Sequence, residues 1–153
     1  MKRFLLCVDG SRAGMQAARL AIRLAVEGGG EIRAVCATAD GEVAEAVDAA
    51  GSREDSAADR LKRAATAVLA RVEDLARSQG LRAESVLREG EPLEVILDEA
   101  RHWQPDLLVI GRTGRRGPAS AVLGSVTAHV LEFTEWPVLV VPVPHDSVPK
   151  QGN

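Results

Sequence analysis

The sequence predicts a three-layer α/β fold, in which an open five-stranded parallel sheet carries helices on both faces. Two patterns support this prediction. Apolar runs of strand length alternate with amphipathic segments of helix length along the chain. Most of the apolar runs are continuous, and that is the pattern of strands buried on both faces of a parallel sheet.

The first half of the chain is expected to begin with a strand, a helix and a second strand. Residues 3–8 form an apolar run, and residues 11–27 place small and apolar side chains on one helical face. The glycines at 28–30 end this helix. Residues 31–37 form the second strand, and residues 38–55 mix acidic and small residues, which predicts a loop with at most one helical turn.

The second half is expected to add two strand and helix pairs, a further helix and a last strand. A long amphipathic helix over 56–78 ends at Gly80. Proline near the first turn starts the next helix, which runs to about Trp103, and Ser125 is expected to be the N-cap of the last helix. The remaining segments are strands over 83–87, 107–110 and 138–141, and helices from about 91 and over 125–132.

Length and charge restrict the classes of function. A chain of 153 residues predicts one domain, which we place at 1–144, followed by a flexible, proline-containing tail at 145–153. The net charge of −3 means that basic residues are not in excess, so nucleic acid and acidic membrane surfaces are not expected as partners. No apolar stretch reaches the length that spans a membrane, and the apolar start is too short for a signal peptide. We therefore expect a small soluble ligand.

The two cysteines are expected to be free and buried. Cys7 and Cys36 both stand in apolar strand segments, where a thiol behaves as a small apolar side chain. A disulfide is conceivable if their strands are neighbours, but a chain that is not exported meets a reducing compartment. Their spacing is not that of a metal site.

A spaced glycine set follows the fourth predicted strand. Gly111 and Gly114 are separated by nine residues from Gly124 and Ser125, at the start of a helix. Glycines let the backbone approach an anion, and the N–H groups and positive dipole end of the helix attract it. This predicts a phosphate site in which Ser125 is the main ligand and Thr127 lies behind it. The alternative is that these are ordinary turn glycines.

Asp9 stands at the tip of the first strand. If the strand order is 3-2-1-4-5, the order reverses between the first and fourth strands, so Asp9 and the glycine set share one crevice. A carboxylate there can accept hydrogen bonds from a ribose hydroxyl. The alternative is that Asp9 only turns the chain into the first helix beside Ser11.

The equipment for fast phosphoryl transfer is missing. Neither the dinucleotide glycine pattern after the first strand nor a P-loop lysine before Ser125 occurs. Arg112, Arg115 and Arg116 either neutralise a triphosphate or face solvent. No acidic residue lies between Gly111 and Ser125, so the protein supplies no metal site there, and Mg²⁺ or Mn²⁺ would be held mainly by the phosphates. No catalytic residue is identified.

The chain resembles the universal stress proteins of the small, single-domain, ATP-binding kind. The glycine set matches the ATP signature of that family, and the similarity extends to the residues at 7–11 and through 124–127 to 136–141. The resemblance implies the strand order 3-2-1-4-5, a cytoplasmic location, ATP as ligand, and homodimers that pair through Val138 to Val143. That segment is apolar and is expected at the edge of the sheet, where a strand of another chain would cover it.

The resemblance also implies a set of nucleotide contacts. Adenine and ribose would contact Cys7, Val8, Asp9, Ala37 and Ile110. The phosphates and ribose would be held by Gly111, Thr113, Gly114, Gly124, Ser125, Val126 and Thr127.

Three functions are compatible with such a site. The preferred one is an ATP-binding stress-response or regulatory protein with at most weak hydrolysis. The alternative is a slow ATPase or nucleotidyl-transfer enzyme on a similar fold, but the motifs expected of adenylyl-transferring relatives are absent. A phospho-accepting receiver module is the least favoured, since Asp9 lacks the paired acids of such modules.

Overall fold

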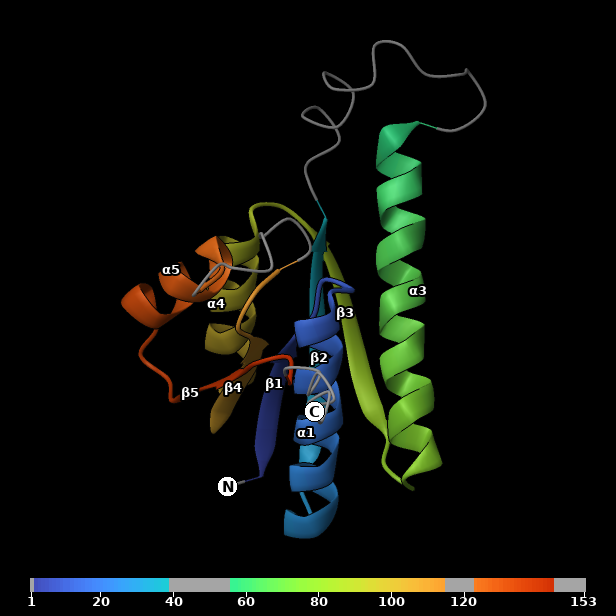
Figure 1. The fold of residues 1–153 in the computed structure, drawn as a ribbon, viewed down its shortest axis with the longest axis vertical. Helices are drawn as coiled ribbons and strands as arrows, with labels where there is room; N and C mark the ends of the chain where they lie inside the picture. The colour runs from blue at the N-terminus through green and yellow to red at the C-terminus, as the bar shows by residue number, and fades with distance from the viewer. Residues whose placement is uncertain (1, 39–55, 115–122, 145–153) are drawn as a thin grey trace, which may run out of the picture.

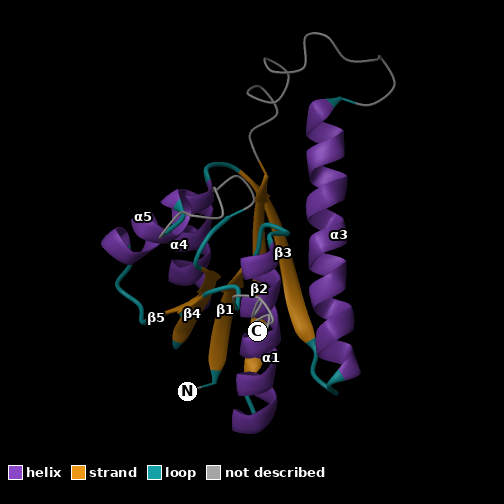
Figure 2. Cartoon of the chain, viewed as in Figure 1, coloured by secondary structure: helices purple, strands orange, loops and turns teal. Residues whose placement is uncertain are grey.

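The computed structural model describes residues 2–38, 56–114 and 123–144, and within these ranges the chain alternates strands with helices (Figures 1 and 2). The predicted loop at 39–55 and the tail at 145–153 lie outside the described residues. In chain order the elements are β1 (Arg3–Cys7), α1 (Arg12–Gly28), β2 (Glu31–Thr38), α3 (Ala57–Ser78), β3 (Ala83–Glu89), α4 (Pro92–Trp103), β4 (Leu107–Gly111), α5 (Ser125–Phe133) and β5 (Val138–Val141).

The five strands form one parallel sheet in the order β3-β2-β1-β4-β5, which confirms the predicted fold class and strand order. β1 is central, with Cys7 beside Val35 of β2 on one side and beside Ile110 of β4 on the other. The order reverses between β1 and β4. The carboxyl ends of these two strands are therefore the place where an open α/β sheet binds ligands.

Helices cover both faces of the sheet. α1 and α3 pack on one face, and α4 and α5 on the other (Figure 1). Successive residues of β1 face opposite ways, so Leu6 joins the core under α1 and α3 whereas Leu5 joins the core under α4 and α5. Both are fully buried at 0% exposure, and this double burial explains why the strands read as continuous apolar runs.

The helix ends follow the predicted signals with one exception. The Ser11 side chain caps α1 by accepting a hydrogen bond from the Gly14 N–H, and Gly29 ends that helix in the left-handed region at φ 63°. The expectation that Ser125 caps α5 is wrong, because Gly124 occupies the N-cap position with extended φ and ψ and Ser125 is already helical. Glycine is itself an accepted N-cap residue, so the sequence signal was ambiguous by one position.

Both cysteines are free, as expected. Although β1 and β2 are neighbours, Cys7 faces the core under α4 and α5, and Cys36 faces the core under α1 and α3. Opposite faces of a sheet cannot be bridged by a disulfide. Burial raises the pKa of the Cys7 thiol to about 12, so this side chain stays neutral.

None of the helices in the described ranges has the length and apolar character needed to cross a membrane. Trp103 and Trp136 pack at the margin of the core under α4 and α5.

The carboxylate of Asp106 binds the backbone at the start of β1, at the amino end of this strand. The Asp106 carboxylate accepts hydrogen bonds from the backbone N–H groups of Lys2, at 2.6 Å, and Arg3, at 2.9 Å. These two bonds hold the pKa of Asp106 below its ordinary value of 3.8, because they stabilise the ionised form. The contact closes a loop that spans most of the chain.

The Asp106 contact is expected to make stability depend on acid pH. A carboxyl whose folded-state pKa is lowered contributes stability that is complete above its ordinary pKa and is lost as pH falls through the folded pKa. We therefore expect the unfolding free energy of the wild type to fall more than that of Asp106→Asn as pH drops below about 5. Urea unfolding of both proteins at several pH values measures the difference. Parallel pH profiles would contradict the assignment.

Candidate functional site

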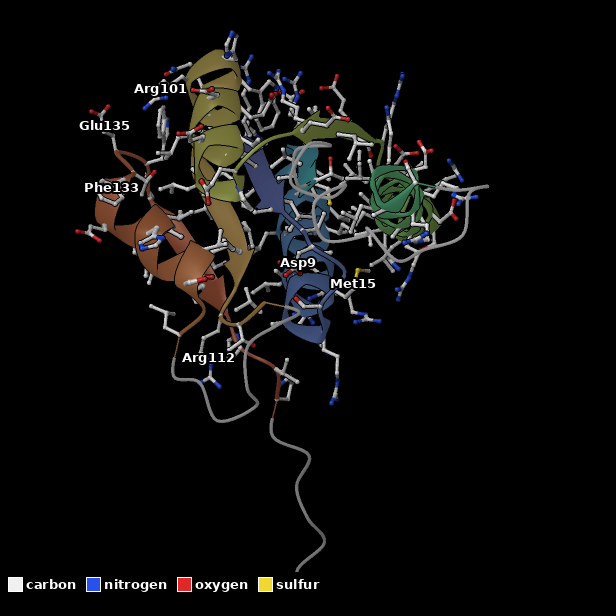
Figure 3. All side chains as sticks on the ribbon, turned by 90° about the horizontal axis from the view of Figure 1, so that it is seen from above. Asp9, Met15, Arg101, Arg112, Phe133 and Glu135 are labelled. Carbon is white, nitrogen blue, oxygen red and sulfur yellow. The ribbon has the colours of Figure 1, made fainter. Side chains whose placement is uncertain are left out.

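The loops that follow β1 and β4 meet at the carboxyl edge of the sheet, as the sequence predicted. The Ser11 hydroxyl donates to the carbonyl oxygen of Thr113 at 3.4 Å, which joins two loops far apart in the sequence. Seen from above, this edge carries the labelled Asp9 beside the start of α1 (Figure 3). The adjacency assumed from the strand order is thus present.

Asp9 serves the turn into α1 and also faces the glycine loop. Its Oδ1 accepts a hydrogen bond from the Ser11 N–H at 2.9 Å, so the helix-start reading of this residue is correct for one oxygen. Its Oδ2 lies against Gly114, where an added Cβ would come within 3.0 Å of it. Because the side chain is exposed and has two oxygens, the turn does not use up its capacity to accept hydrogen bonds.

The predicted glycines differ in what an added side chain would contact at each position. A Cβ on Gly111 would lie 2.7 Å from backbone atoms of Ala13 and Gly14, so this glycine lets α1 pack directly on β4. A Cβ on Gly124 would lie 3.2 Å from the Gly114 nitrogen. Asp9, Gly114 and Gly124 therefore form a contiguous row that leads from the tip of β1 to the start of α5.

The amino end of α5 closes this row. The Gly124 N–H donates to the Arg112 carbonyl at 2.8 Å and is directed into the protein. No side chain among the described residues caps α5. The first turn of a helix leaves its N–H groups without intrahelical partners, so those from Ser125 onward are the donors that this end can offer. Ser125 is exposed at the position expected for a phosphate ligand.

Thr127 and Val126 position α5. The buried Thr127 hydroxyl donates to the Gly111 carbonyl at 2.8 Å, which ties α5 to β4. Its side chain is thus committed inside the protein, and its backbone is the part that can face a ligand. Val126 is half-buried and packs against the core under α4 and α5.

The residues expected to contact adenine and ribose form the base of the edge. Cys7, Val8 and Ile110 are 5–6% exposed, so they can offer a ligand little besides backbone. The Val8 N–H is already bonded to the Val35 carbonyl at 3.0 Å. Ala37 is half-buried and lies two residues beyond Val35, the partner of Cys7, so it stands level with Asp9.

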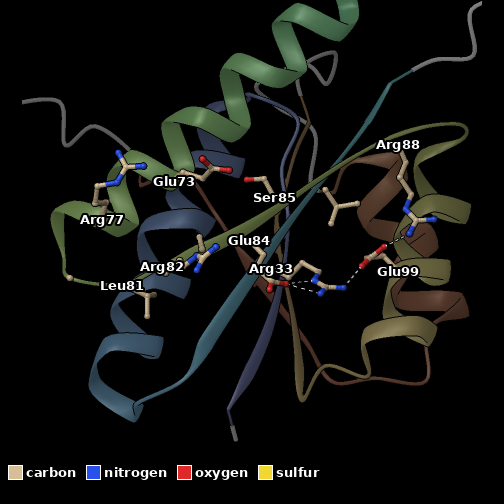
Figure 4. A pocket seen from close by; sticks show the side chains of 12 residues that line it. Arg33, Glu73, Arg77, Leu81, Arg82, Glu84, Ser85, Arg88 and Glu99 are labelled. Carbon is tan, nitrogen blue, oxygen red and sulfur yellow. Dashed lines mark hydrogen bonds and ion pairs between the residues drawn. The ribbon is translucent and has the colours of Figure 1, made fainter.

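A groove of about 990 Å³ lies elsewhere, along the outer edge of β3, and contains none of the predicted residues (Figure 4). Its walls hold a charged network that the sequence reasoning missed. Arg33 donates to Glu84 at 2.7 Å and to Glu99 at 2.7 Å, and Arg88 lies 2.9 Å from Glu99. Since these charges neutralise one another, we regard the groove as the gap beside an edge strand and place the functional site at Asp9 and the glycine row.

Metal ligands do not gather at this edge. Within the described ranges no group of three or more His, Cys, Asp or Glu side chains is placed to hold an ion. His102 contacts the Asp98 carbonyl on its own helix, and His129 stacks near Phe133 on α5. Both histidines of the described ranges thus contact residues of their own helices.

The universal stress protein family model matches residues 1–142, nearly the whole chain. The chain belongs to the universal stress protein family. A relative from Methanocaldococcus jannaschii, universal stress protein MJ0531, is 32% identical over 143 residues, which cover 94% of this chain and 83% of the relative. The family resemblance inferred from the glycine set is confirmed.

Solved structures of universal stress proteins share the fold. One, a universal stress protein in complex with cAMP, is 25% identical, superposes with a TM-score of 0.67 and covers 92% of this chain and 96% of that one. Another, from Archaeoglobus fulgidus in complex with dAMP, is 23% identical with a TM-score of 0.65 and covers 92% and 97%. Structural neighbours of this universal stress protein thus bind adenine nucleotides.

Proposed function

We propose that this universal stress protein binds ATP at the carboxyl edge of its sheet and acts as a nucleotide-dependent stress-response or regulatory protein. The observation that carries the proposal is the contiguous row of Asp9, Gly114 and Gly124, which ends at the start of α5, where no side chain of the described ranges caps the helix. The row begins with a carboxylate that can accept hydrogen bonds from ribose hydroxyls. It continues with two glycines and ends at the amino end of a helix, which attracts phosphate. Ribose and phosphates follow one another in the same order in a nucleotide. The adenine nucleotides bound by structural neighbours support the same ligand class.

Each part of ATP has a proposed place along this row. Asp9 accepts from the ribose hydroxyls, and Ala37, Cys7, Val8 and Ile110 border the adenine. Thr113, Gly114 and the amides of the first turn of α5, from Ser125 through Val126 and Thr127, surround the phosphates. Gly124 keeps the path open, and Gly111 borders it with its backbone. Any Mg²⁺ or Mn²⁺ is held mainly by the phosphates, because no metal-binding cluster occurs in the described part of the chain.

The first test is the nucleotide content of the purified protein. The chain has two tryptophans and no tyrosine, so bound adenine raises absorbance near 260 nm clearly above that of the protein. We expect an adenine nucleotide in an acid extract, or stoichiometric binding when ATP is added. No binding in either experiment overturns the proposal. Steady ATP hydrolysis at ordinary enzymatic rates would instead favour the alternative, an ATPase or nucleotidyl-transfer enzyme.

The Asp9→Ala variant tests the place of the ribose. A hydrogen bond to a charged carboxylate contributes about 1.5–3 kcal/mol, so we expect ATP affinity to fall about tenfold or more. Asp98→Asn is the matched control, because Asp98 is an exposed acid on α4 whose carboxylate pairs with Arg101. Calorimetric titration measures both variants. An unchanged affinity in folded Asp9→Ala would remove this residue from the site.

We further propose a cytoplasmic homodimer that pairs through the segment from Val138 to Val143. β5 is an edge strand, and its residues Val138, Leu139 and Val140 are only half-buried within one chain. An apolar edge of this kind is normally covered by another strand. The expected result of sedimentation equilibrium is twice the single-chain mass of 16.2 kDa. A single-chain mass at micromolar concentration would overturn the proposal.

A further inference from the structure

Arg112 stands at the far end of the proposed phosphate path and is held there by its backbone. Its N–H donates to the Val141 carbonyl at 2.8 Å, and its carbonyl accepts from the Gly124 N–H at 2.8 Å. These bonds fix the residue between the end of β5 and the start of α5. Figure 3 labels the side chain of Arg112 at some distance from that of Asp9.

One nitrogen of the Arg112 guanidinium is left without a partner in the described part of the chain, because its Nε is buried and has no acceptor there. Arg33, by contrast, is half-buried and donates to both Glu84 and Glu99 at 2.7 Å. Leaving a buried donor unsatisfied costs about 1–3 kcal/mol, and more for a charged group. An acceptor that arrives from outside would remove this cost.

The surroundings of Arg112 favour an anion as that acceptor. The positive end of α5 begins at Gly124, which is bonded directly to Arg112, and the sequence from Gly111 to Ser125 contains no acidic residue. Asp9, the one carboxylate of the row, lies at the ribose end, against Gly114. A nucleotide whose ribose is at Asp9 therefore extends its last phosphates toward Arg112.

We propose that Arg112 contacts the terminal phosphates and makes this protein select nucleoside di- and triphosphates over adenosine monophosphate and its cyclic form. The proposal rests on the proposed function, since it assigns a further residue to the same site. It gives Arg112 a role in specificity, because AMP and cAMP lack the phosphates that reach this end. A charged arginine fork is well suited to phosphate oxygens.

The test compares the affinities for ATP, ADP, AMP and cAMP in the wild type and in Arg112→Gln. We expect the wild type to prefer ATP to AMP, and the variant to lose about tenfold or more of ATP affinity with AMP affinity nearly unchanged. Because AMP binding is read in the same variant, it also reports that the site is folded. Arg112→Lys keeps the charge but loses the planar fork, so its ATP to AMP ratio should fall between the two.

Arg82→Gln is the matched control, since Arg82 is exposed and lines the groove beside β3, away from the glycine row. Its ATP to AMP ratio is expected to equal that of the wild type. An unchanged ratio in both Arg112 variants overturns the role of Arg112 and leaves ATP binding intact. A wild type that binds none of the four nucleotides overturns both this inference and the proposed function.

Discussion

Gly114→Val is expected to weaken ATP binding by at least about tenfold, equivalent to about 1.4 kcal/mol, while the protein stays folded. A Cβ at Gly114 would lie 3.0 Å from Asp9 Oδ2, and a branched side chain would fill the space between Asp9 and the start of α5. The nearest atom belongs to the end of an exposed side chain, which can turn away without disturbing the core. Titration calorimetry gives the affinity, and urea unfolding gives the stability.

Two other glycines provide the matched controls for this substitution. Gly28→Ala should leave both binding and stability unchanged, because a Cβ there meets nothing within 4 Å. Gly111→Ala should lower the unfolding free energy by about 1–3 kcal/mol, since its Cβ would lie 2.7 Å from the backbone of α1. Full ATP affinity in folded Gly114→Val would show that ATP does not pass this glycine.

Most of the fold could be predicted because its signals are local. Continuous apolar runs indicated buried parallel strands, and the glycines and capping serines marked helix ends within a residue or two. The order of the strands followed from the family resemblance and not from periodicity. The predicted end of β3 at Leu87 was early, because pairing with β2 continues as far as Thr38 beside Glu89. The polar residues at that end belong to an edge strand, where apolar periodicity is weak.

The site was predictable in part for the same reason. Asp9 and Gly114 follow the carboxyl ends of β1 and β4, which the strand order places side by side, and Gly124 starts the helix that follows β4. The packing role of Gly111 was not predictable, because it depends on how closely α1 approaches β4, which is a three-dimensional fact. The inward direction of the Gly124 N–H likewise depends on the Arg112 carbonyl across the loop.

The network at Glu99 was missed although the sequence carried a signal for it. Glu99 falls on the apolar face of α4, between Ile96 and Trp103, where a charged residue is unexpected. Its partners Arg33 and Arg88 lie on different strands, and only the register of β2 with β3 brings them together. An acidic residue on the apolar face of a helix therefore predicts that a basic side chain from elsewhere in the sequence pairs with it, but does not identify that residue.

Arg33→Met is expected to be the most destabilising substitution of this network, with a loss of about 3 kcal/mol in unfolding free energy. Glu99 is 1% exposed and its Oε1 accepts from Arg33 at 2.7 Å. Removing Arg33 leaves this buried carboxylate with Arg88 alone, which lies 2.9 Å from Oε2 without making a hydrogen bond. Removing one partner of a buried ion pair costs more than the pair itself contributes, because the remaining charge cannot reach water.

The same reasoning predicts that the loss is largely recovered when Glu99 is also replaced. In Glu99→Leu the arginines that remain are partly exposed and can be solvated, so this variant should lose less stability than Arg33→Met. The double variant should then be more stable than Arg33→Met, and urea unfolding of all four proteins gives the coupling free energy. Arg77→Met is the control, since its ion pair with Asp74 is exposed and should contribute less than about 1 kcal/mol. Additive losses in the double variant would mean that Glu99 and Arg33 act independently.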